Sequence, residues 1–116
     1  MSSIESISVE EGNPVYDSRN DCNALIKTAD NELYLGCKNT KIPEDVTKIG
    51  GNAFYGCKNL NTVVIKTAKL TRKTVGANAF AKIGAKPVVT VPAKQFNTYK
   101  TLLRSKGMST KAVYKK

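Results

Sequence analysis

The 116-residue chain contains no histidine, no tryptophan and only three cysteines. Without histidine it cannot build a Ser-His-Asp or Cys-His catalytic arrangement, or a zinc site with a histidine ligand. Three thiols (Cys22, Cys37 and Cys57) are too few for a four-cysteine zinc site, and their odd number leaves one without a disulfide partner. We therefore expect a non-enzymatic protein with no catalytic residue, no metal ligand and no cofactor.

Long hydrophobic runs are also missing. Nothing in the chain approaches the 18 consecutive apolar residues that a membrane span requires, and residues 1–3 lead directly into strand-like sequence without a signal segment. Either the protein is cytosolic or the sequence starts after its targeting region. A hydrophobic content of 41% over this length predicts one globular domain, residues 1–116.

Acidic residues are absent from the second half of the chain. Residues 1–57 hold all nine Asp and Glu with five Lys and Arg, whereas residues 58–116 hold fourteen Lys and Arg. The net charges are therefore −4 and +14. This asymmetry predicts either a basic surface that meets an anionic polymer or a face that only keeps the chain soluble.

One stretch occurs twice. The sequence IGGNAFYGCKNLNTVVIK from Ile49 aligns without a gap on VGANAFAKIGAKPVVTVP from Val75, at an offset of 26 residues. A fixed period in the twenties is typical of stacked repeats, because one unit cannot bury its apolar face alone. The sequence therefore predicts a short α/β solenoid of about four turns, with repeats over residues 1–92.

Each turn of this solenoid is expected to contribute a strand. The predicted equivalent positions are Val9, Ile42, Ile65 and Val91. Alternate residues of a strand share a face, so the residues between the apolar ones are expected to point outward. The outward positions of interest are Ser8, Val64, Lys66 and Thr90.

The first step between strands, from Val9 to Ile42, is longer than the others. Two apolar runs at residues 24–26 and 33–35 flank the turn-forming residues 29–31, which predicts a β-hairpin at about residues 23–37. We expect this hairpin to be inserted into the repeat pattern.

The repeated stretch is expected to form the return path between strands. Gly50 and Gly76 suit a tight bend, and Asn52 and Asn78 suit a corner where polar side chains bond the backbone. In the residues that follow, Phe54 and Phe80 occupy equivalent positions. They are expected to stack in the core rather than to bind a ligand.

The pattern changes after Pro92. Residues 94–106 place apolar side chains at Phe96, Tyr99, Leu102 and Leu103, the spacing of an amphipathic helix that Gly107 would end. Residues 111–114 then resemble a last short strand. Residues 93–116 are therefore expected to form a helical C-terminal cap over the open end of the repeats.

The pattern IP-x-x-V-T-x-IG-x-x-AF-x-GC-x-x-L, from Ile42 to Leu60, resembles the BspA-like leucine-rich repeat family. NPVYDS from Asn13 and the CNALI that follows are similar to repeats of that family. The resemblance implies a leucine-rich-repeat solenoid from a bacterial surface or secreted protein, associated with adhesion and protein binding. With so few units, the chain is expected to be a C-terminal fragment of a longer array.

The cysteines permit two interpretations. Cys57 falls on Ile83 at the repeat offset, so a buried structural thiol is favoured there. A disulfide between Cys22 and Cys37 around the hairpin is the alternative.

Candidate partner-binding residues combine the outward strand positions with the basic clusters. They are Ser8, Val64, Lys66, Lys69, Arg72, Lys73, Thr90, Lys100 and Arg104. The first hypothesis is an interaction module that binds a protein or an anionic glycan or wall polymer. The second is a purely structural C-terminal cap. A nucleic-acid binder is a distant third, because few aromatic residues accompany the basic ones and no nucleic-acid motif is visible.

Overall fold

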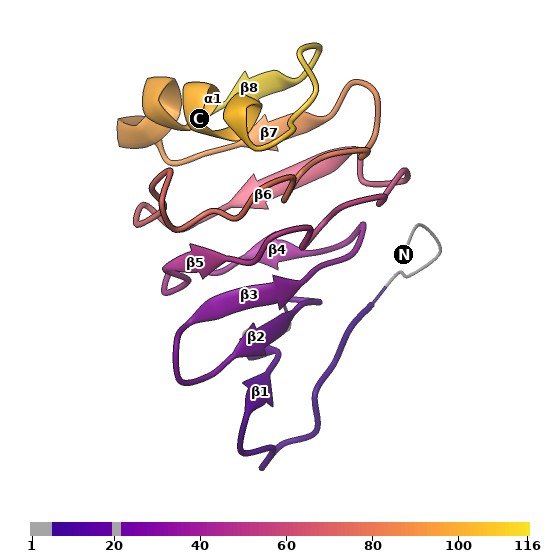
Figure 1. Ribbon diagram of the computed structural model, residues 1–116, viewed down its shortest axis with the longest axis vertical. Coiled ribbons are helices and arrows are strands. Elements are labelled where there is room, and N and C mark those ends of the chain that lie inside the picture. Colours follow the sequence, from indigo (N-terminus) through magenta and orange to yellow (C-terminus); the bar gives the residue numbers. More distant parts are fainter. Residues whose placement is uncertain (1–5, 20–21) are drawn as a thin grey trace.

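The structure, a computed structural model, describes residues 6–19 and 22–116. Its strands are β1 (Tyr16–Asp17), β2 (Leu25–Lys27), β3 (Glu32–Leu35), β4 (Lys41–Ile42), β5 (Lys48–Ile49), β6 (Thr62–Ile65), β7 (Val88–Thr90) and β8 (Val113–Lys115). A 3₁₀ turn (Ala93–Gln95) leads into the single described helix, α1 (Phe96–Ser105). The elements follow the long axis of the molecule from β1 at one end to β8 and α1 at the other (Figure 1).

The sheet formed by β4, β6, β7 and β8 is parallel throughout. Ile42 lies opposite Ile65, and Val64 lies opposite Thr90, which confirms the predicted register of these two steps. The strands form because alternate residues such as Val63 and Ile65 are buried while the residues between them are not. The parallel sheet and the C-terminal helix fit an α/β repeat fold.

The other sheet has the order β1-β2-β3-β5. β2 and β3 are antiparallel, which confirms the hairpin. However, β3 also pairs in parallel with β5, with Leu33 opposite Ile49, and Ile49 in turn bridges Val75. The prediction of an inserted hairpin is therefore corrected for β3, which pairs in register with the later repeats, with Leu33 buried like Ile49 and Val75. β2 departs from this parallel pattern, because it is antiparallel to both of its neighbours.

The strand expected around Val9 is not present. Residues 6–10 form no strand, Ile7 and Val9 are only half-buried, and Ile4 lies outside the described residues. The place beside β4 is taken by Cys22, whose carbonyl accepts a hydrogen bond from the Lys41 N–H at 3.0 Å. The N-terminal segment instead descends beside the ladder of strands toward the β1 end (Figure 1). The predicted equivalence of Val9 with Ile42 was wrong for this reason.

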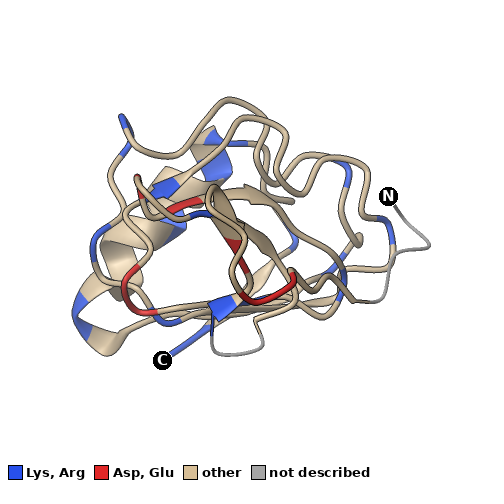
Figure 2. Ribbon diagram, turned by 90° about the horizontal axis from the view of Figure 1, so that it is seen from below, with Lys and Arg blue, Asp and Glu red and all other residues tan. Residues whose placement is uncertain are grey.

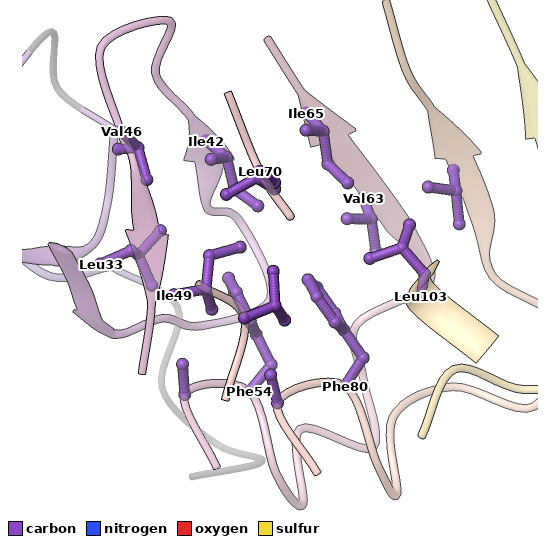
Figure 3. Packing of buried hydrophobic residues seen from close by; sticks show 14 of the residues in the cluster. Leu33, Ile42, Val46, Ile49, Phe54, Val63, Ile65, Leu70, Phe80 and Leu103 are labelled. Atoms are coloured by element: carbon purple, nitrogen blue, oxygen red, sulfur yellow. The ribbon is translucent and has the colours of Figure 1, made fainter. Parts of the chain in front are cut away.

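The two repeated phenylalanines form the centre of the core, as predicted. The rings of Phe54 and Phe80 stack with centroids 5.1 Å apart and planes 11° apart. Figure 3 shows them among aliphatic side chains of both sheets. Gly36 continues the stack, since a Cβ there would lie 2.1 Å from the Phe54 ring. One buried cluster runs from Cys22 to Met108.

The repeated corners are built differently from the expectation. Asn52 and Asn78 both adopt positive φ, 62° and 59°, so asparagine makes the turn. Gly50 and Gly76 do not have positive φ. Instead, a Cβ on Gly76 would lie 2.2 Å from the Gly51 nitrogen, so this glycine permits close contact between successive repeats.

The C-terminal elements agree with the prediction of a helix and a last strand. Tyr99, Leu102 and Leu103 of α1 are buried. The Tyr99 hydroxyl donates to the Thr67 carbonyl at 2.8 Å and accepts from the Leu70 N–H at 3.1 Å. After the helix, the Lys106 carbonyl accepts from the Phe80 N–H at 3.1 Å. The helix is thereby tied to the last repeat at two places.

The three cysteines are free and buried, as the structural-thiol interpretation predicted. The alternative disulfide between Cys22 and Cys37 is not formed. Burial raises the pKa of Cys22 and that of Cys57. Because the thiolate is the reactive form, these two thiols are poor nucleophiles and metal ligands.

Candidate functional site

The structure distributes the nine candidate residues over several places. Val64 and Thr90 lie in register on the outward face of the parallel sheet, between Lys41 of β4 and Lys115 of β8. We call these four residues the outward row. Ser8 is exposed, but it lies on the N-terminal segment and not on a strand of this sheet.

Lys66 lies apart from Lys69 and Arg72, although the three are close in sequence. It lines a hollow of about 390 Å³ together with Lys41, Pro43, Glu44 and Asp45. Two carboxylates therefore share this space with two ammonium groups. An anion is less favoured here than the sequence suggested, because the local charges offset one another.

Lys69 and Arg72 line a different cavity, of about 470 Å³, between the connection after β6 and helix α1. We call it the cap groove. The connection contributes residues 68–72, and the helical side contributes Gln95, Thr98, Thr101 and Leu102. No acidic residue lines this groove. Of the nine candidates, only Lys69 and Arg72 are brought to it.

The connection that forms one wall of the cap groove is held by hydrogen bonds. The Thr67 hydroxyl donates to the Val46 carbonyl at 2.6 Å and accepts from the Lys69 N–H at 3.1 Å. Leu70 is anchored to the Tyr99 hydroxyl, and the N–H of Thr71 donates to the Thr74 hydroxyl at 2.9 Å. The groove is therefore preformed, with a tethered wall on the connection and a helix opposite.

Lys100 and Arg104 lie four residues apart on α1, away from the groove-lining Thr98 and Thr101. The Lys100 ammonium is 5.8 Å from the centroid of the Phe96 ring and 5.9 Å from that of Tyr114. These distances are within the range of cation–π attraction. Lys100 is thus partly engaged within the cap, whereas Arg104 is exposed. Lys73 is exposed on the connection and lines neither cavity.

The two halves of the chain differ in how their charged side chains are paired. In Figure 2, viewed from the β1 end, acidic segments occupy the central and left parts of the view, whereas basic segments occur all around it. The ion pairs between described residues are Arg19 with Asp17 and Asp45, and Lys27 with Asp30. All lie in the first half, so the cations of residues 58–116 are not neutralised within their own half.

The described residues include no group of three Cys, Asp or Glu side chains placed to hold a metal ion. Nor does the described part of the chain contain a helix long and apolar enough to cross a membrane. What the arrangement offers is charge, hydroxyl groups and a partly apolar groove. These are properties of a binding surface.

Sequence reasoning missed the helical side of the groove. Gln95, Thr98 and Leu102 follow the i, i+3, i+7 spacing of one helix face. The sequence analysis used helical spacing only to find the apolar face of the helix, and so did not consider this partly polar face. A polar row beside that stripe was the available signal. That this row meets the connection after β6 required the three-dimensional structure.

Comparison with known families gives one match. A family model described as BspA type leucine rich repeat region matches residues 27–105 in six copies. The match includes β3, consistent with its place in the repeat stack. No curated protein and no solved structure gave a match.

Proposed function

Since the chain belongs to the BspA-type leucine-rich repeat family, we propose that it is a non-enzymatic interaction module of a bacterial cell-surface or secreted protein. In this proposal its basic C-terminal half binds an anionic partner, either a protein with an acidic surface or an anionic glycan or wall polymer. Leucine-rich repeats are typically protein-interaction modules, and this family is typically found on bacterial surfaces or secreted.

The observation that carries the proposal is the concentration of unneutralised charge. Residues 58–116 contain fourteen Lys and Arg without one acid, and Lys69, Arg72, Lys73 and Arg104 are all exposed. A surface of one sign attracts a partner of the other sign over about a Debye length, roughly 8 Å at physiological ionic strength. These exposed cations form no ion pair with a described residue, so they are available to an anion that approaches the cap.

We also propose how the repeats and the C-terminal segment are organised into a domain. The repeats are taken to form one short solenoid domain, residues 1–116, with residues 93–116 as its cap. The parallel ladder through β4, β6, β7 and β8 supports this, as does the second parallel column through Leu33, Ile49 and Val75.

A purely structural cap is the second candidate. It is favoured by the hydrogen bonds that tie Tyr99 and Lys106 to the last repeat. A structural cap, however, does not require unpaired cations along a groove. Nucleic-acid binding remains third, because Lys100 and Lys116 lie over the Phe96 ring and so limit its use for base stacking.

The test measures binding of heparin, as a model polyanion, at increasing salt. A cluster variant replaces Lys69, Arg72 and Lys73 with Gln, and leaves out Lys66 because Glu44 and Asp45 share its hollow. The control variant replaces Lys58, Lys86 and Lys111 with Gln; these three are exposed and line neither cavity. Arg19 and Lys27 would not serve as controls, because both residues form ion pairs.

We expect the chain to bind at low salt and to release as salt rises. The cluster variant should bind about tenfold more weakly, since each exposed charge pair contributes about 0.2–1 kcal/mol. The control variant should lose clearly less. Equal losses would show a net-charge effect only, and no binding at low salt would leave the structural cap as the better account.

A further inference from the structure

The cap groove combines features that a simple basic surface lacks. Its apolar lining is formed by the exposed Ala68 and by Leu70 and Leu102, which belong to the core and are 4% and 3% exposed. We call these three residues the floor of the groove. Lys69 and Arg72 stand at the same groove, both exposed, and the described residues offer them no ion pair. An anion bound here would meet both positive charge and apolar surface.

The helical side supplies hydrogen-bonding groups. Thr98 and Thr101 present hydroxyls, and Gln95 presents an amide. Thr98 and Thr101 are exposed, and no described residue forms a hydrogen bond with their side chains. Hydroxyl and amide groups along a groove can satisfy the N–H and C=O groups of an extended peptide.

The dimensions also fit a short peptide. The helical side of the groove, from Gln95 at the end of the 3₁₀ turn to Leu102 of α1, covers about 10 Å at about 1.5 Å per residue. An extended chain advances about 3.3 Å per residue, so about three residues match this length. In such a segment the middle side chain points opposite to its two neighbours. One apolar side chain can then face the floor while two flanking carboxylates face the rim.

We propose that the cap groove binds a short acidic segment of a partner protein, with an apolar residue between two carboxylates. The proposal rests on the function proposed above and names its partner class. The charge complementarity of Lys69 and Arg72 selects carboxylates, and the apolar floor selects a peptide. An anionic glycan carries the charge but lacks the apolar side chain that would occupy the floor.

The test is fluorescence anisotropy with three labelled peptides, each flanked by glycines. The first has the core Glu-Leu-Asp, the second Glu-Ser-Asp and the third Gln-Leu-Asn. Burial of the leucine side chain should make the first peptide bind about tenfold more tightly than the second. The third peptide should bind most weakly, because it carries no carboxylate in its core.

Two variants locate the peptide. Lys69→Gln with Arg72→Gln should weaken binding of the Glu-Leu-Asp peptide about tenfold. Lys58→Gln with Lys86→Gln removes the same charge from exposed positions outside the groove and should change it less than about twofold.

A third variant, Thr98→Trp, places a large side chain at an exposed position of the groove without changing the charge. It should abolish peptide binding and leave heparin binding unchanged. Thr101→Trp, at the neighbouring exposed position, repeats the test if the first variant folds poorly. The thermal midpoint of each variant verifies that the chain remains folded.

The outcomes separate this proposal from the general one. If the Ser and Leu peptides bind equally, or if both Trp variants still bind the peptide, the groove proposal is wrong while heparin binding upholds the basic surface. If the Trp variants lose heparin and peptide alike, the groove is a general polyanion site, and the proposal that it selects an acidic peptide is overturned. If neither peptide nor heparin binds, both proposals fail.

Discussion

The two ends of the molecule both close the apolar core, but they use their charged residues in opposite ways. At the β1 end, Arg19 is held between Asp17 and Asp45, with N–O distances of 2.6 and 3.0 Å, and it also donates to the Asn31 side chain. At the α1 end, closure depends on Tyr99 and on the carbonyl of Lys106, while cations such as Arg72 remain exposed. Internally paired charge supports the fold, whereas unpaired charge is available to a partner.

The core that joins the two ends should give the largest mutational effect. Phe80→Ala removes one ring of the Phe54–Phe80 stack and leaves a cavity between the last repeats, so it should lower the free energy of unfolding by about 3–5 kcal/mol. Chemical denaturation measures this loss. A change within about 0.5 kcal/mol, as at an ordinary surface position, would contradict the stacked core.

The C-terminal end should be sensitive to a single hydroxyl. Tyr99→Phe removes the oxygen that bridges the Thr67 carbonyl and the Leu70 N–H, both in the connection that lines the cap groove. Leaving these groups unsatisfied should cost about 1–3 kcal/mol of unfolding free energy. The matched control is Tyr34→Phe, because Tyr34 is 52% exposed and should tolerate the change. Equal losses of unfolding free energy for the two substitutions would show that the Tyr99 hydroxyl does not stabilise the C-terminal end.

The C-terminal end was also the more predictable one. Helical spacing from Phe96 to Leu103 and the glycine at position 107 were enough to predict α1. The repeat offset likewise predicted the Phe54–Phe80 stack, because equivalent positions in stacked repeats share an environment. Lys69 and Arg72 were selected from charge alone.

The N-terminal end and the groove were harder to predict. Local alternation at Ile7 and Val9 resembles a strand, but a strand also needs a pairing partner, and Cys22 occupies the place beside β4. The charge density around Lys66 did not reveal that Glu44 and Asp45 lie beside it. Both are consequences of long-range contacts, which local patterns do not contain.

The N-terminal end should respond to acid. Hydrogen bonds from Arg19 lower the pKa of Asp17 from 3.8 to about 2, against the opposing effect of burial. A depressed carboxyl pKa stabilises the fold above the unfolded-state pKa, and this contribution is lost as the pH falls from about 4 to 2.

Asp17→Asn should therefore lower the free energy of unfolding at pH 6 by about 1 kcal/mol, a value reduced because the ion pair is partly exposed. The difference in stability between parent and variant should vanish near pH 2. Unfolding free energies of parent and variant between pH 2 and 6 give the comparison. Asp30→Asn is the control, since Asp30 contacts Lys27 only at 3.9 Å on the surface and should change stability by less than about 0.5 kcal/mol. A difference for Asp17→Asn that is independent of pH would contradict the paired-charge description of this end.

Whether partners bind at the C-terminal end is tested most directly by mapping backbone amide shifts in a nitrogen-15 labelled sample while heparin is added. We expect the resonances of residues 66–73 and 94–116 to move, those of β1 to β3 to stay in place, and the changes to fade as salt screens the exposed charges. Shifts spread equally over both ends, or shifts largest at the β1 end, would contradict the claim that unpaired cations at the cap form the binding surface.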